Sequence, residues 1–230
     1  MEKKGKMIVI SLIFIFIVAS ISIFYLYPKN IYSSSSSSIL GKTEYGNVLK
    51  EGPYGNSSSP IKIAYIIGVH PLESDAHQAI LESIKNNDKS LKYSYYIYRI
   101  NVTKDAGDYE KGRLNGQLLA NKFAVPDIEN QKFQLVVDIH SNVGNWQEKR
   151  FVFSPVKGSK AELIARNIKN NIPWLKYYIP PNPTSTSYVT IPLIEAGIPS
   201  ILYETYHYDT YEMTKNHANE FVLTVDNLKF

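Results

Sequence analysis

Residues 61–87, "IKIAYIIGVHPLESDAHQAILESIKNN", run from a strand pattern through a polar turn into a helix pattern. Residues 61–69 are mostly apolar or β-branched, which is typical of a buried strand. From Asp75 onward the apolar residues recur at helical spacing, and Asp75 is placed to cap the helix. His70 and Glu73 stand between the two elements. A strand that ends by presenting an imidazole and a carboxylate indicates a functional site at the edge of a sheet.

The alternation of strand and helix continues to the C-terminus. Runs rich in aromatic and β-branched residues alternate with amphipathic runs, and Ser159 is placed to cap one of the helices. This alternation predicts an α/β domain over residues 60–230, with a mostly parallel or mixed central sheet flanked by helices. Further strands are expected over 93–102, 133–141, 149–156 and 198–206, and helices within 108–124 and over 159–172, 188–197 and 211–228.

The composition is that of one globular domain with additional segments. The chain has 230 residues, of which 44% are hydrophobic, so a packed core is expected. Its net charge is +4, but Lys3, Lys4 and Lys6 precede the first apolar run, and the remainder is near neutral. No binding of nucleic acid is therefore expected. The absence of cysteine excludes disulfides, cysteine-ligated zinc and thiol catalysis.

The N-terminal part contains an uncharged apolar run, "MIVISLIFIFIVASISIFYLY", over residues 7–27. A helix of this length can cross about 30 Å of hydrocarbon. Lysines within residues 1–6 favour a cytoplasmic N-terminus, so the run predicts a single-pass anchor in the cell membrane with the catalytic domain outside. The alternative is a signal peptide cleaved near "VAS" at 18–20, although apolar residues continue beyond that point. Both interpretations export the folded domain.

Residues 28–59 have the composition of a flexible tether. The segment "SSSSSS" at 33–38 and the segment "GNSSSP" at 55–60 flank a polar stretch with few apolar residues. Serine-rich and glycine-containing segments of this kind are typical of flexible linkers. The sequence therefore predicts a Ser-rich spacer that holds the domain of residues 60–230 away from the membrane.

Three of the expected strands end in side chains that can carry out chemistry. The first leads to His70 and Glu73, "VVDIHS" places His140, and "SILYETY" places Glu204. In open α/β sheets, sites form where parallel strands end. Two histidines and a glutamate are the ligand set of one class of catalytic zinc site, and zinc lowers the pKa of water towards neutrality. A further carboxylate, here Glu204, is then needed to transfer the proton.

Each of these residues also has an ordinary structural explanation. An "HxxE" pair arises often by chance, His140 could be a core histidine, and Glu204 could be a salt-bridged carboxylate. The convergence of independent strand ends favours the metal site over these explanations. The remaining histidines, His77, His207 and His217, are expected to be structural or solvated, although His207 follows Glu204 closely enough to take part in the site.

The motifs "GVHPLE", "DIHS" and "LYET" occur in an order that resembles a known family. The sequence is similar to the zinc carboxypeptidase family and its deacylase relatives, the succinylglutamate desuccinylase and aspartoacylase group, over most of residues 61–206. The resemblance implies that His70, Glu73 and His140 bind one zinc ion. It also implies that Glu204 is the general acid and base.

The stretch "GRLNGQLLANKF" is the counterpart of the family's substrate-binding segment. The resemblance implies that Arg113 polarises the scissile carbonyl and that Asn121 and Lys122 hold the substrate carboxylate. The family has arginine at the second of these two positions, and lysine offers a point charge in place of a bidentate fork. The alternative for the whole stretch is an amphipathic helix with a basic outer face.

Two further assignments follow from the same resemblance. The acidic residue that usually precedes the asparagine–arginine pair, and that supports a zinc-bound histidine, is absent here, and Leu118 and Leu119 stand in its place. Asp138 could substitute for it, because it lies two residues before His140 and so on the same face of a strand. Tyr188 matches the mobile tyrosine that covers the substrate in the family.

The function expected from the sequence is that of a membrane-anchored zinc hydrolase facing outward, which acts on an amide bond in a peptide or a cell-wall peptide. A zinc-dependent deacylase of a small N-acyl amino acid would use the same chemistry, but such metabolites are cytoplasmic and export argues against it. A non-catalytic binding module on the same fold is the third alternative. The retention of both histidines and both glutamates argues against this last one.

Overall fold

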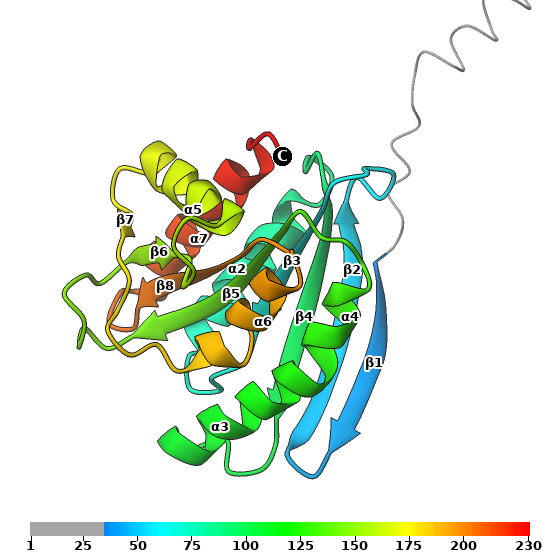
Figure 1. Ribbon diagram of the computed structural model, residues 1–230, viewed down its shortest axis with the longest axis vertical. Helices are drawn as coiled ribbons and strands as arrows, with labels where there is room; N and C mark the ends of the chain where they lie inside the picture. Colours follow the sequence, from blue (N-terminus) through cyan, green and yellow to red (C-terminus); the bar gives the residue numbers. More distant parts are fainter. Residues whose placement is uncertain (1–34) are drawn as a thin grey trace, which may run out of the picture. The chain divides into compact units, whose positions relative to one another are not determined.

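The structure is a computed structural model, and it describes residues 35–230 of the chain (Figure 1). Its centre is an eight-stranded mixed sheet with the strand order β1-β2-β4-β3-β5-β8-β6-β7. The α/β fold expected from the alternating pattern is confirmed. The strands are β1 (Ser36–Thr43), β2 (Gly46–Gly55), β3 (Lys62–Ile67), β4 (Ser94–Val102), β5 (Leu135–Asn142), β6 (Phe151–Phe153), β7 (Lys176–Tyr177) and β8 (Ser200–Tyr206).

Helices cover both faces of the sheet (Figure 1). The elements α2, α5 and α7 share one apolar cluster on one face, whereas α3, α4 and α6 belong to a second cluster on the other face. Strand β5 alternates between the two clusters, because successive side chains of a strand point to opposite faces. The helical elements are α2 (Ser74–Asn87), α3 (Tyr109–Leu119), the π-helical turn η1 (Ala120–Ala124), α4 (Val125–Glu129), α5 (Lys160–Asn171), the 3-10 turn η2 (Ser185–Ser187), α6 (Thr190–Glu195) and α7 (Tyr211–Asp226).

The central strands of the sheet are parallel and the outer ones are mixed. Strand β5 pairs in parallel with β3 on one side and with β8 on the other. Strand β2 is antiparallel to β4, and β6 is antiparallel to β8. The strands that end in the predicted site residues, β3, β5 and β8, are therefore direct neighbours, and their carboxyl ends lie at one edge of the sheet.

One of the two predicted helix caps is confirmed and the other is wrong. The Ser159 side chain accepts a hydrogen bond from the Glu162 backbone N–H, as an N-cap residue does. Asp75 lies inside the first turn of α2, which begins at Ser74. The residue before that helix is Glu73, whose side chain makes no capping bond, since its carboxylate is engaged elsewhere.

The expectation of a flexible tether over 28–59 is wrong for residues 36–55. These residues form β1 and β2, which pair with each other, and β2 pairs with β4. Val48 and Tyr54 are buried in the two apolar clusters. Pairing with a distant strand provides partners for the backbone, so the Ser-rich composition does not prevent a strand. The folded sheet therefore begins well before residue 60.

The predicted membrane anchor at residues 7–27 lies outside the described residues, as does the start of the predicted tether. Within residues 35–230, no helix combines the length and the apolar character needed to cross a membrane.

Candidate metal centre and active site

The turn between β3 and α2 brings His70 and Glu73 together. Gly68 follows β3 with a φ of +86°, and a Cβ atom at this position would meet the Ile100 carbonyl oxygen at 2.1 Å. Only glycine fits such a close approach in this backbone conformation. The chain then turns, and the Glu73 backbone N–H donates to the His70 carbonyl at 3.1 Å. Both side chains are buried, and they contact each other.

The Glu73 carboxylate is the centre of the site. Its Oε1 lies 3.0 Å from Nδ1 of His70, and its Oε2 lies 2.9 Å from Nδ1 of His140. The Ser141 backbone N–H donates to Oε2 at 3.0 Å, and the Arg113 Nη1 group donates to Oε1 at 3.0 Å. His70, Glu73 and His140 can each offer one ligand atom, and these atoms lie within 4.8 Å of one another. The structure thus brings together the three predicted ligands.

The electrostatics of this trio suit a bound cation. Burial raises the pKa of Glu73, but the two imidazoles outweigh it and hold the pKa well below its usual value. Glu73 is therefore an anion, as a carboxylate ligand must be. Burial lowers the pKa of His140, but Asp138 and Glu73 outweigh it and raise the pKa well above normal. A position between two carboxylates that favours a proton also favours a metal ion.

His70 behaves as a neutral imidazole. Burial lowers its pKa to about 4, which the charge of Glu73 only partly opposes. Neutral histidine is the form that binds metals. Imidazole nitrogen and carboxylate oxygen are donors that zinc accepts, so the chemistry of the donor set fits this ion.

Each of the two histidines has an outer partner on its second ring nitrogen. Nε2 of His140 lies 3.0 Å from Oδ2 of Asp138, although the two atoms are not aligned for a hydrogen bond. Asp138 is thus in the place expected for it. Nε2 of His70 lies 3.1 Å from the side-chain nitrogen of Gln117, which also contacts the Thr184 hydroxyl oxygen at 3.2 Å. Such outer partners orient metal-binding histidines.

Gln117 is a site residue that the sequence reasoning missed. It is buried on α3, four residues after Arg113. Residues four apart lie on the same face of a helix. That spacing was a signal in the sequence, because a helix that presents Arg113 to the site also presents the residue one turn later.

Glu204 lies opposite His140. The two are Cα partners on the parallel strands β5 and β8, so the sheet itself holds them side by side. The Asn142 side chain donates to Oε2 of Glu204 at 3.4 Å and also to the Thr205 carbonyl at 2.9 Å. Burial raises the pKa of Glu204 to about 8, while the nearby His140 lowers it. The carboxyl group can therefore hold or release a proton near neutral pH.

A cavity of about 530 Å³ opens over these residues, which is an ordinary size for a small-ligand site. His70, Glu73, Arg113 and Glu204 line it, and so does His207. The remaining lining comes from the turn between β3 and α2, the start of α3, the end of β5 and the segment after it, strand β8, and η2 with the loop before it. These residues are Leu72, Tyr109, Glu110, Ser141, Asn142, Val143, Asn145, Trp146, Pro180, Asn182, Pro183, Thr184, Ser185 and Leu202.

Asn121, Lys122 and Tyr188 are not among the residues that line the cavity. The Asn121 side chain donates to the Tyr188 carbonyl at 2.8 Å. The Lys122 ammonium lies 5.4 Å from the centre of the Phe123 ring. Both belong to η1, where the wider π-helical turn changes which residues face the site. Their role in substrate binding, and that of Tyr188, stays a prediction.

The histidines expected to be structural differ in their surroundings. Nε2 of His77 lies 3.2 Å from the Ile139 carbonyl, so this buried ring joins α2 to β5. His217 stacks on Trp174, with ring centres 3.9 Å apart. His207 is exposed and lines the cavity.

Solved structures of other proteins share the fold of this chain, whereas comparisons of sequence found no match. No protein-family model matches the chain, and no curated protein matches it. A metallo-carboxypeptidase from Burkholderia cenocepacia superposes with a TM-score of 0.55 at 12% identity, covering 86% of this chain and 65% of that one. A succinylglutamate desuccinylase/aspartoacylase from Rhodobacter sphaeroides has a TM-score of 0.56 at 13% identity, covering 86% of this chain and 67% of that one.

A third solved structure belongs to the same group. An aspartoacylase family protein from Mesorhizobium loti superposes with a TM-score of 0.51 at 13% identity and covers 83% of this chain and 66% of that one. The chain thus spans about two thirds of the length of these three proteins. The chain has the fold of the metallocarboxypeptidases and of the succinylglutamate desuccinylase/aspartoacylase proteins, as its motifs predicted, and a possible metal site lies at the strand ends of that fold.

Proposed function

We propose that this chain is a zinc-dependent hydrolase that cleaves an amide bond in a peptide. The observation that supports it most is the cluster of His70, Glu73 and His140 with Glu204 on the neighbouring strand. A ligand set and a separate proton carrier are the minimum that metal-assisted hydrolysis of an amide needs. The likeness in fold to metallocarboxypeptidases also supports a metal-dependent hydrolase.

In this proposal His70 and His140 would hold a zinc ion through Nδ1, the nitrogen that faces Glu73 in each ring, and Glu73 would hold it through its carboxylate. The bound ion would supply Lewis acidity for the substrate carbonyl and for water. Gln117 and Asp138 keep the two imidazole rings in orientation from their other side. Two histidines and a glutamate are the protein ligands of one class of catalytic zinc site.

The other side chains act on the substrate and on the proton. The Arg113 guanidinium lies beside Glu73, where it stabilises the negative charge that develops on the carbonyl oxygen. Glu204 takes a proton from water and passes it to the leaving nitrogen, and Asn142 holds its carboxylate in place. Water is added across the C–N bond, so the products are a carboxylic acid and an amine.

The place of action is also a proposal. The apolar residues 7–27, with lysines before them, support a membrane anchor with the hydrolase domain outside the cell. A domain held at the outer surface meets cell-wall peptides, so a wall peptide is the substrate that we favour.

A deacylase acting on a small N-acyl amino acid is the second candidate. The likeness in fold to the aspartoacylase proteins from Mesorhizobium loti and Rhodobacter sphaeroides favours it. The same metal site would serve both reactions. Hydrolysis of wall peptides and of N-acyl amino acids by the purified full chain, measured side by side, separates the two candidates.

The test of the proposal compares two glutamates of the site. Glu204→Gln should retain zinc, because the residue is not a ligand, and should lower hydrolysis by a factor on the order of 10²–10⁴. Glu73→Gln should lose zinc, because it removes the anionic ligand. Zinc content by atomic absorption and the rate of peptide hydrolysis, both on the full chain, are the measurements.

Glu129→Gln is the matched control. Glu129 is an exposed glutamate at the end of α4, outside the cavity, and its replacement should change neither quantity. Equal loss of zinc in the two site variants would make Glu204 a ligand or a support of the site. Zinc binding by the unaltered chain without hydrolysis of any tested amide would favour the non-catalytic binding module.

A further inference from the structure

We infer that the substrate carries no free carboxylate on the residue that follows the scissile bond, so the enzyme cuts internal or blocked amides and does not trim C-terminal residues. This inference rests on the proposed function and names its class of substrate. It follows from the charges that line the cavity, from the position of Arg113, and from the exposed apolar side chains at the cavity mouth.

The cavity lining contains three carboxylates and a single guanidinium. Glu73, Glu110 and Glu204 line it, and among residues 35–230 the only lysine or arginine that does so is Arg113. Arg113 is already paired with Glu73, and Glu110 adds a further negative charge to the lining. A substrate carboxylate entering the cavity would therefore find no cation beyond those already paired, and burying a charge without a partner is costly.

The position of Arg113 is fixed next to the metal ligands. Its Nη1 group donates to Glu73 at 3.0 Å, its Nη2 group lies 3.5 Å from the Thr184 hydroxyl oxygen, and its guanidinium stacks over Tyr109 at 4.8 Å from the ring centre. A cation held there reaches an oxygen at the scissile carbonyl. The carboxylate of the following residue would lie farther along the chain, because each residue spans about 3.3–3.6 Å.

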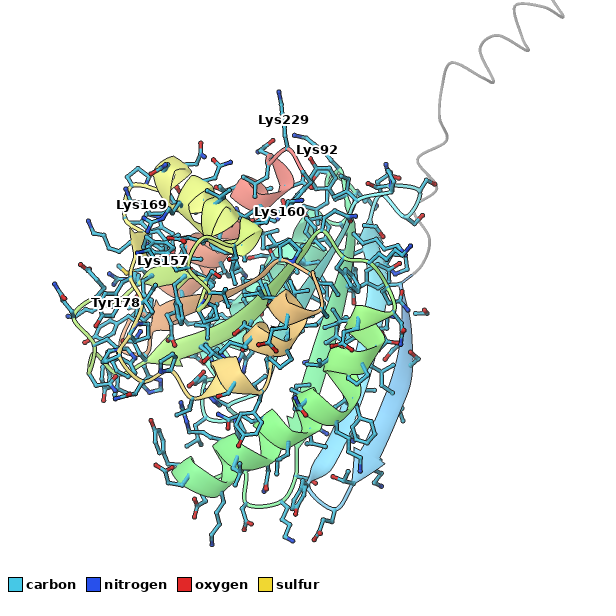
Figure 2. The ribbon with its side chains drawn as sticks, in the orientation of Figure 1. Lys92, Lys157, Lys160, Lys169, Tyr178 and Lys229 are labelled. Atoms are coloured by element: carbon cyan, nitrogen blue, oxygen red, sulfur yellow. The ribbon has the colours of Figure 1, made fainter. Side chains whose placement is uncertain are left out.

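Lysine side chains elsewhere in the described part of the chain do not bring a second cation to the cavity. Lys122 lies against Phe123 and does not line the cavity. The lysines labelled in Figure 2 gather around α5 and the C-terminal end of the chain, and none of them lines the cavity. Among residues 35–230, no lysine and no arginine other than Arg113 lines the cavity.

Besides Glu110, Arg113, Glu204 and His207, the polar side chains that line the cavity beyond the proposed metal ligands are neutral. Asn145, Asn182 and Ser185 line the cavity. An amide side chain both donates and accepts hydrogen bonds, as a peptide group does, so these residues match a continuing peptide backbone. A carboxylate would use only their donors and leave their acceptors facing a negative charge.

The mouth of the cavity continues into exposed apolar side chains. Leu72 is 47% exposed, Tyr109 54% and Val143 50%, and all three line the cavity. Exposed apolar groups gathered at a pocket mark a binding surface. Such a rim suits the side chains of a substrate that extends beyond the cavity on both sides of the scissile bond.

Matched peptides test the inference. The full chain, purified in mild detergent and loaded with zinc, is given N-acetylated peptides that end in a free carboxylate, in a carboxamide, or in one additional residue after the scissile bond. We expect kcat/KM to be at least about tenfold higher for the carboxamide and the extended peptide. An equal or higher value for the free carboxylate overturns the inference.

A binding measurement keeps this test separate from the proposed function. Peptide hydroxamates, which chelate zinc, are made with a terminal carboxylate or a terminal carboxamide, and their affinities are compared by calorimetry. The carboxamide should bind at least about tenfold more tightly. If no peptide is hydrolysed, the proposed function fails, while the ratio of affinities still decides for or against the inferred preference.

A charge added to the lining supplies the matched variant. Asn182→Arg places a second cation in the cavity and should shift the affinity ratio several-fold towards the carboxylate, whereas Asn182→Gln should leave the ratio unchanged. An unchanged ratio in Asn182→Arg would mean that charge does not govern the preference, and the inference would be overturned.

Discussion

Glu73 makes contacts that a residue at the start of a helix rarely makes. The residue before a helix commonly uses its side chain to cap the free backbone N–H groups. The Glu73 carboxylate instead accepts from Arg113 and the Ser141 backbone and contacts both imidazoles. The start of α2 therefore lacks a side-chain cap, and its orientation depends on the same contacts that form the metal site.

Gln117 determines which nitrogen of His70 is free to bind a metal. If Nδ1 is the ligand, Nε2 carries the hydrogen and needs an acceptor. The nitrogen and oxygen of a glutamine amide exchange places when the group rotates by half a turn. In the rotated form, the amide oxygen accepts from both Nε2 of His70 and the Thr184 hydroxyl, the two groups that the amide already contacts.

Replacement of Gln117 should therefore weaken the metal site. Gln117→Leu removes the acceptor, and we expect zinc affinity to fall by about 10–100-fold, the usual effect of losing an outer partner. Gln117→Glu keeps an acceptor and should retain most of the affinity. Competition with a chromophoric chelator gives the affinities, and the absorption spectrum of the cobalt-substituted protein reports the ligand geometry.

Gln78→Leu is the control for this pair. Gln78 is an exposed glutamine on α2 that donates to Glu82, away from the cavity, and its loss should not change zinc affinity. Equal affinity in Gln117→Leu and the unaltered chain would show that His70 is oriented without Gln117.

At the scale of the elements, the strands that carry the site were predictable and the hairpin at the edge was not. The apolar runs before His70, His140 and Glu204 are short and rich in β-branched and aromatic residues, which favours buried strands, and the polar site residues stand at or just after their ends. Strands β1 and β2 have a linker's composition. Strand β2 pairs with β4, which lies about fifty residues further along the chain, and β1 pairs with β2. Such distant pairing leaves no local pattern.

Helix α3 also shows a limit of what the sequence can predict. Its existence is plain from the sequence, but the π-helical turn η1 after it was not expected. An extra residue in a helical turn rotates everything that follows. The side chains before the turn, Arg113 and Gln117, contact the site, and Asn121 and Lys122 within it do not line the cavity.

The position of α3 depends on a glycine. A Cβ atom at Gly116 would meet the Val69 carbonyl oxygen at 2.0 Å, and this atom belongs to the backbone just before His70. The helix lies closer to the turn than any larger residue allows. That close approach is what lets Arg113 reach Glu73 and Gln117 reach His70.

Gly116→Ala should push α3 away from the site. We expect the free energy of unfolding to fall by about 1–3 kcal/mol, the usual cost of overpacking, with a loss of hydrolytic activity. Thermal denaturation and activity assays measure the two effects. Gly107→Ala is the control, because a Cβ at Gly107 meets nothing within 4 Å and should change neither. Unchanged stability in Gly116→Ala would mean that the contact with Val69 relaxes easily.

At the scale of the whole molecule, the early start of the sheet shortens the proposed spacer. If residues 7–27 cross the membrane, residues 28–35 separate them from β1, which begins at Ser36. An extended chain spans at most about 3.6 Å per residue, so these eight residues cover roughly 29 Å. The substrate that we propose would therefore be wall material near the membrane.

The lack of cysteine in the chain makes the topology testable with introduced ones. Ser58→Cys places a thiol on an exposed residue of the folded domain, and Lys3→Cys places one before the apolar run. On intact cells, a membrane-impermeant maleimide should label the first variant, and it should label the second only after lysis. The opposite pattern would reverse the topology and remove the argument for a wall substrate.

The pairing of β5 with β8 has a consequence for protein engineering. His140 and Glu204 face each other because the backbone ladder aligns them, and adjacent strands are separated by about 4.8 Å in any sheet. The distance between His140 and Glu204, the proposed metal ligand and the proposed proton carrier, is thus a property of the ladder and not of the loops. A designer could exchange the loops at residues 143–150 and 178–187 to change the selectivity of the protein while keeping this spacing intact.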